Sequence, residues 1–160
     1  MDTQDPRRRM GRDGRLLDAS VLDALLCPGP ASSHALTWLE QVGEGQLAVT
    51  GWSVLQLEAQ WSQRRHKQRA APDFNLLEAF LSQRCWLYCW TAEDLAAARL
   101  RLRFRPSLGS ILPMPLLLEM LLAFRLGLLP VSFNPACRAA ADTLGYPLEV
   151  PPTLRQQWCG

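Results

Sequence analysis

Short apolar runs alternate with longer stretches of helical spacing along almost the whole of this 160-residue chain. The runs of strand length are residues 16–17, 46–50, 85–90 and 129–133, with a possible last edge strand at 148–150. Between them, apolar residues recur every three or four positions. Strands that alternate with helices pack as a largely parallel sheet covered on both faces. The pattern therefore predicts a three-layer α/β/α sandwich with a central, mostly parallel sheet.

The stretch from Arg99 to Arg105 fits two patterns. Arginines alternate there with Leu100, Leu102 and Phe104, which is a strand period, but the alanines just before it favour a helix. We predict a helix that frays before Pro106, followed by a loop over 107–110. The other expected helices are one that contains Val21 to Leu26 and is stopped by Pro28, one that Ser32 or Ser33 caps and that ends at Gly43, and four more over residues 52–67, 74–83, 115–126 and 135–144.

Composition and the chain ends narrow the class of protein. We expect a flexible basic arm over 1–14, one domain over 15–150 and a C-terminal tail over 151–160. The arm lacks the apolar core of a signal peptide, and the longest apolar region, 111–124, is broken by two prolines and a glutamate. We therefore expect a cytoplasmic protein with no membrane partner. A net charge of +2 and five cysteines without CxxC spacing give no sign of nucleic-acid binding, a disulfide scaffold or a zinc ribbon.

Polar residues follow three of the expected strands directly. Asp18 comes after the first strand, Thr50 ends the second, and Asn134 follows the fourth. Ligands of parallel sheets bind at the carboxyl ends of the strands. We expect these three side chains to share one edge of the sheet.

With those residues placed, the chain resembles the PIN domain superfamily of metal-dependent nucleases over residues 16–150. The resemblance rests on four segments, which are LLDASVL at 16–22, ALTWL at 35–39, VT at 49–50 with VLQL at 54–57, and AFRLGLLPVSFN at 123–134. It implies a PIN-like fold. It also implies a cluster of three or four carboxylates that holds Mg²⁺ or Mn²⁺ and activates water to cut RNA. Many members of the superfamily are toxins of bacterial toxin–antitoxin pairs.

Transferred onto this sequence, the acidic positions of the family are mostly lost. The first falls on Asp18, but the others fall on Gln56, Leu116 and Asn134, two neutral amides and an apolar side chain. Glu119, about 60° round a helix from Leu116, is a possible substitute, whereas Glu58 should face away. No cofactor is expected, and Mg²⁺ or Mn²⁺ would bind through Asp18 only if the site were active.

The resemblance and its losses lead to two hypotheses. The preferred one is a degenerate PIN-like protein without nuclease activity that binds RNA or a protein. The alternative is a metal-dependent ribonuclease that uses Asp18 and Glu119, of the kind that acts as the toxin of a toxin–antitoxin pair with an antitoxin-like partner. A homodimer is also compatible with the family. Four arginines could contact RNA, meet an acidic partner or face solvent, namely Arg99, Arg101, Arg103 and Arg105.

Overall fold

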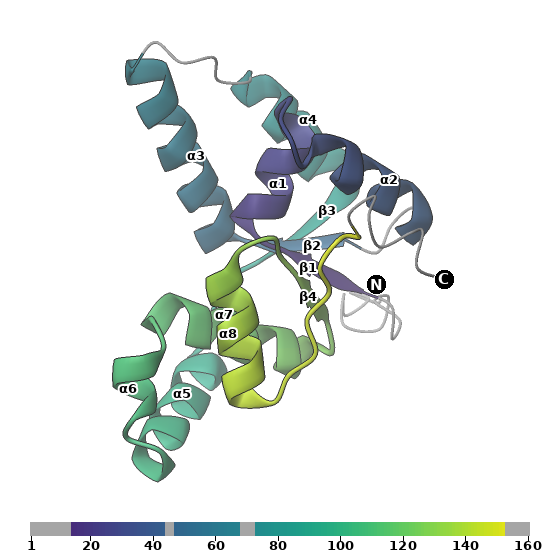
Figure 1. Cartoon of the computed structure of the whole chain (residues 1–160). Helices are drawn as coiled ribbons and strands as arrows, with labels where there is room; N and C mark the ends of the chain where they lie inside the picture. Colours follow the sequence, from purple (N-terminus) through teal and green to yellow (C-terminus); the bar gives the residue numbers. More distant parts are fainter. Residues whose placement is uncertain (1–13, 44–46, 68–72, 153–160) are drawn as a thin grey trace, which may run out of the picture.

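The computed structural model describes residues 14–43, 47–67 and 73–152. The strands are β1 (Arg15–Leu17), β2 (Leu47–Thr50), β3 (Cys85–Tyr88) and β4 (Leu129–Val131). The helices are α1 (Ala19–Leu26), α2 (Ser32–Val42), α3 (Gly51–His66), α4 (Phe74–Arg84), α5 (Ala92–Phe104), α6 (Leu108–Ile111), α7 (Met114–Leu126) and α8 (Pro135–Leu144). Figure 1 shows the sheet between two groups of helices, α1–α4 on one side and α5–α8 on the other. The predicted three-layer α/β/α sandwich is confirmed.

The four strands form one parallel sheet in the order β3-β2-β1-β4. The chain moves from β1 through β2 to β3, then returns across the sheet to pair β4 with the free side of β1. Because crossovers between parallel strands are right-handed, reversing the direction of travel places the later helices on the opposite face. The direction changes between β1 and β4, and this is where parallel sheets usually bind ligands.

Alternate side chains of the strands enter two separate cores. Leu17 and Val49 are fully buried against α1, α2 and α3. Their neighbours Leu16 and Ala48 point to the other face and pack against Leu122 of α7. The strands are therefore apolar on both faces, as expected for a parallel sheet between two helical layers.

Local predictions were mostly confirmed, with one clear error. α5 continues as a helix to Phe104, so the helical interpretation of the arginine-rich segment is confirmed. The loop expected over 107–110 is wrong, because buried Leu108 anchors the single-turn helix α6 there. The expected edge strand at 148–150 contributes only one bridge, between Val131 and Glu149.

The chain ends lie largely beyond the part of the structure that is described. Of the arm predicted over 1–14, only Gly14 is described, and of the tail predicted over 151–160, only Pro151 and Pro152. Within the described ranges, no helix combines the length and the hydropathy needed to cross a bilayer.

Candidate functional site

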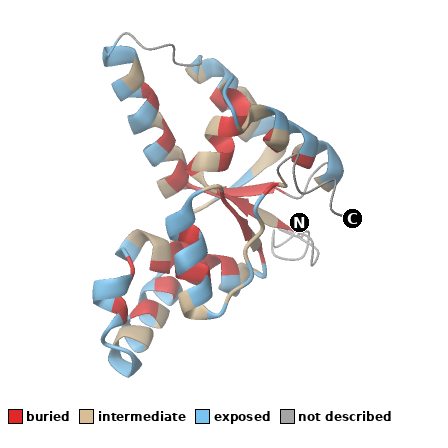
Figure 2. Ribbon diagram, in the orientation of Figure 1, coloured by how far each residue is buried: buried red, intermediate tan, exposed pale blue. Residues whose placement is uncertain are grey.

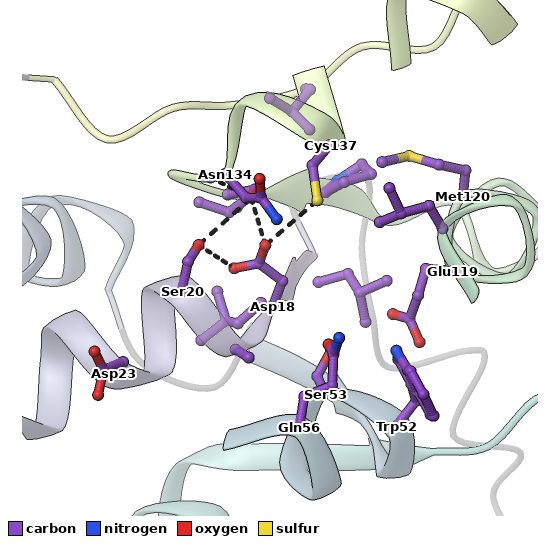
Figure 3. A pocket seen from close by; sticks show the side chains of 18 of the residues that line it. Asp18, Ser20, Asp23, Trp52, Ser53, Gln56, Glu119, Met120, Asn134 and Cys137 are labelled. Atoms are coloured by element: carbon purple, nitrogen blue, oxygen red, sulfur yellow. Dashed lines mark hydrogen bonds between the residues drawn. The ribbon is translucent and has the colours of Figure 1, made fainter. Parts of the chain in front are cut away.

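A cavity of about 260 Å³ opens at the carboxyl ends of β1 and β4, where the strand order reverses. Its walls come from the start of α1, the first turns of α3, the middle of α7 and the β4–α8 junction (Figure 3). The four acidic positions transferred from the family, together with the possible substitute on α7, all line this one cavity. They are Asp18, Gln56, Leu116, Asn134 and Glu119. Glu58, which was expected to face away, is not among the lining residues.

Asp18 is tied into the protein through both of its carboxylate oxygens. Oδ1 caps α1 by accepting from the Val21 backbone N–H at 3.1 Å, and it also accepts from the Ser20 hydroxyl at 2.6 Å. Oδ2 accepts from the Ser132 hydroxyl and, at 3.5 Å, from the Cys137 thiol. Burial raises the pKa of the Cys137 thiol to about 11, so this group is a protonated donor at neutral pH.

These four donors leave the Asp18 carboxylate little capacity for a metal ion. A carboxylate offers about four lone-pair directions, and each oxygen here already accepts two hydrogen bonds. The neighbouring hydroxyls are themselves engaged, because Ser20 Oγ accepts from the Phe133 N–H at 3.0 Å and Ser132 Oγ from the Asn134 N–H at 2.9 Å. Asp18 therefore acts as a cap that joins α1 to the end of β4.

Glu119 reaches the same cavity from α7, on the opposite side from Asp18 (Figure 3). Its Oε1 accepts from the Thr50 hydroxyl at 2.6 Å and from the Trp90 indole N–H at 3.0 Å. Burial raises the pKa of the Glu119 carboxyl to about 7, although these two hydrogen bonds oppose the change and the negative charge of Asp18 adds to it. At neutral pH a proton therefore competes with any cation for this group.

The expectation that strand-end polar residues share one edge agrees with these contacts. Thr50 caps α3 through the Ser53 N–H at 3.1 Å and binds Glu119, while Asn134 caps α8 through the Ala136 N–H at 3.0 Å. The Asn134 side-chain oxygen is thus used within its own helix. Asp23 also lines the cavity, but Arg64 binds both of its oxygens, at 2.7 and 2.9 Å.

Several residues that bind the two carboxylates of the cavity were not singled out as site residues from the sequence. Ser20, Ser132 and Cys137 donate to Asp18, and Trp90 donates to Glu119. For Ser132 the sequence carried a usable sign, since it is a polar residue near the end of an expected apolar strand, two positions before Asn134. The sequence carried no sign of the contacts of Cys137 and Trp90, because these contacts depend on how distant helices pack. Trp52 also lines the cavity, and the centre of its ring lies 5.7 Å from that of Trp90.

The four arginines of residues 99–105 lie apart from this cavity. All are on or at the end of α5, and none lines the cavity. Arg101 donates to the Tyr146 hydroxyl at 3.0 Å, and Arg105 donates to the Thr143 carbonyl at 3.1 Å. Only Arg99 and Arg103 are left without a hydrogen bond or ion pair to the described residues.

The donor set does not fit the metal centre that the resemblance implies. Nowhere in residues 14–43, 47–67 and 73–152 do three His, Cys, Asp or Glu side chains come together as a possible metal site. A divalent ion of the Mg²⁺ type prefers several oxygen ligands that include free carboxylates. Here one carboxylate is saturated by donors, one is partly protonated at neutral pH, and the remaining family positions are amides or leucine.

No protein-family model matches the chain, and no curated protein is significantly similar to it. The assignment of the site therefore depends on its geometry.

Proposed function

We propose that this chain is a non-catalytic PIN-like domain that works as a binding module for a protein partner. The observation that carries the proposal is the saturation of the Asp18 carboxylate by Val21, Ser20, Ser132 and Cys137. A nuclease of this family needs that carboxylate free to hold an ion. A residue that caps a helix and joins it to β4 performs a structural role instead.

The charges around the cavity favour a protein partner over RNA. Asp18, Asp23 and Glu119 line it, and no Lys, Arg or His side chain is among the described lining residues. Asp23 is neutralised by Arg64, but no described residue forms an ion pair with Asp18. Without a bound cation, an RNA phosphate at this edge would meet negative charge.

The first experiment measures Mn²⁺ binding by calorimetry to the full chain and to Asp18→Asn. We expect no binding by either protein at millimolar Mn²⁺, and no cleavage of single-stranded RNA with Mn²⁺ present. Asp142→Asn is the matched control. Asp142 is exposed on α8, so this substitution removes the same charge at a position away from the cavity. Micromolar binding that only Asp18→Asn abolishes, accompanied by cleavage, would overturn the proposal in favour of the ribonuclease that uses Asp18 and Glu119.

A gain-of-function variant tests whether the cavity is equivalent to a nuclease site. The triple variant Gln56→Glu, Leu116→Asp, Asn134→Asp adds three carboxylates to one cavity. Clustered carboxylates bind divalent cations, so the variant should acquire Mn²⁺ binding that the parent lacks. Adding three carboxylates at exposed positions of α4, with Asn75→Asp, Ser82→Asp and Gln83→Glu, should not. A correctly folded triple variant that binds no Mn²⁺ would contradict the equivalence.

A further inference from the structure

One side of α5 combines exposed apolar side chains with two arginines that pair with none of the described residues. Leu95, Leu100 and Phe104 are 52%, 55% and 83% exposed, which is unusual for residues of their size in one 13-residue helix. The opposite side of the helix, with Asp94 and Ala98, is buried against α7 and its neighbours. Figure 2 shows this part of the molecule with exposed residues on its outer side. α5 is therefore apolar on two sides, only one of which the domain uses.

The α5 outer face is the surface formed by Leu95, Ala96, Arg99, Leu100, Arg103 and Phe104. At 100° per residue these six positions span an arc of about half the helix circumference, with Arg99, Arg103 and Ala96 in its middle. Glu93, in the first turn of α5, falls near one edge of the same arc, and its carboxylate lies 4.0 Å from Arg125. Between the arginines lies a groove of about 160 Å³ lined by Ala96, Arg99, Leu100 and Arg103. Two cationic and two apolar side chains therefore line the same groove.

The two arginines of this face have no partner within the described residues, unlike the other two of α5. Arg101 is engaged by Tyr146, whose ring centre lies 5.8 Å from its guanidinium, and Arg105 by the Thr143 carbonyl. Arg99 and Arg103 stand one turn apart and project from the exposed arc. Their spacing matches two carboxylates that are also one turn apart on a facing helix.

We propose that the α5 outer face docks an acidic amphipathic helix of a partner protein. This inference rests on the proposed function, since it names the surface and the chemistry of the protein partner. Glutamates or aspartates of the partner would pair with Arg99 and Arg103, and apolar residues on either side would cover Leu95, Leu100 and Phe104. α5 is about 20 Å long, so a partner helix of three to four turns covers it.

Two other occupants fit this face less well. A second copy of the chain in a two-fold dimer through α5 would place its arginines against the same arginines, because such interfaces are self-complementary. RNA binds mainly through phosphate contacts and stacking on aromatic rings. This face offers two free cations and one exposed ring, and its leucines would gain nothing from RNA.

The test uses a fluorescent synthetic peptide that forms a helix with glutamates one turn apart between leucines. Its binding to the full chain is measured by fluorescence anisotropy. The same composition in scrambled order, without an apolar side, is the control peptide. Arg99→Glu, Arg103→Glu should weaken binding of the amphipathic peptide by about tenfold or more. The control is the double variant Lys67→Glu, Arg138→Glu, which makes the same change of net charge at exposed positions elsewhere. It should change the affinity for the peptide by less than about twofold. A peptide with lysine for glutamate should bind the Arg99→Glu, Arg103→Glu variant.

The apolar part of the face is tested separately with Leu100→Ala, Phe104→Ala. Because both side chains are exposed, the melting temperature should stay near that of the parent while peptide binding is lost. Equal affinity for the amphipathic and scrambled peptides, or unchanged affinity in the Arg99→Glu, Arg103→Glu variant, would overturn the docking site. Binding of labelled single-stranded RNA that depends on Arg99 and Arg103 would overturn it in favour of RNA.

Failure of this inference is distinguishable from failure of the proposed function. Manganese binding with RNA cleavage overturns the proposed function whatever the peptide does. A preparation that binds no Mn²⁺ and does not discriminate between the peptides overturns only the docking site on α5.

Discussion

Replacing Glu119 by glutamine should stabilise the protein by about 3 kcal/mol at pH 8 and by less than about 1 kcal/mol at pH 5. The carboxyl is buried, and burial raises its pKa from 4.5 to about 7 in the folded protein. Between these two values the unfolded chain releases the proton while the folded protein keeps it. The stabilising effect of this group is therefore complete below pH 4.5 and is lost as the pH rises to 7.

The size of the effect follows from the difference between the two pKa values. The gap from 4.5 to about 7 corresponds to about 3 kcal/mol, since each pH unit is worth about 1.4 kcal/mol. Glutamine is neutral at every pH, and its oxygen can still accept from Thr50 and Trp90. Its amide nitrogen takes the place of Oε2, which accepts no hydrogen bond from the described residues. The variant should thus gain up to about 3 kcal/mol over the parent at pH 8.

Urea denaturation followed by tryptophan fluorescence at pH 5, 6, 7 and 8 measures this difference directly. The free energy of unfolding of the variant minus that of the parent should rise with pH and level off above pH 7. Other titrating groups contribute equally to both proteins and cancel in the difference. Glu40→Gln, at an exposed position of α2, should show no such rise. An unchanged difference between pH 5 and pH 8, or a Glu119→Gln variant less stable than the parent at pH 8, would contradict a raised pKa of the buried Glu119 carboxyl.

Three further predictions concern the contacts that hold the domain together. Asp18→Ala should lower the free energy of unfolding by about 3 kcal/mol. Asp18→Asn should lower it by about 1 kcal/mol, because asparagine can still cap α1. Equal losses of the two variants in urea denaturation would contradict the role of Asp18 as a cap. Arg125→Met should cost about 3 kcal/mol at pH 7, because it leaves the Asp94 carboxylate buried and unpaired. The paired state lowers the Asp94 pKa, so this loss should shrink as the pH falls below about 4, and an equal loss at pH 3 in thermal melts would argue against it. Leu122→Ala should cost about 3 kcal/mol, and the exposed Leu100→Ala less than about 0.5 kcal/mol, as judged from their melting curves.

Much of the fold was predictable because its elements are encoded locally. Thr91 opens α5 with a capping box to Asp94, and Gly127 and Gly145 end α7 and α8 in the left-handed conformation. Such features act within one turn of the chain, so periodicity and capping identify them. The error over 107–110 has the opposite origin. α6 is a single turn whose position depends on burying Leu108 against other helices, and a segment this short carries no period of its own.

The candidate site was predictable only as a set of positions. Local sequence pattern was enough to predict the alternation of strands and helices, and with it the sheet edge at which Asp18 and Asn134 meet. The hydrogen bonding and protonation of the site's side chains depend instead on the packing of distant segments. The hydrogen bond between Asp18 and Ser132 joins residues 114 apart in the chain, and that between Thr50 and Glu119 joins residues 69 apart. Hydrogen-bond saturation, pKa and the pairing of an arginine depend on atoms that the fold brings together, and local sequence spacing does not encode those contacts.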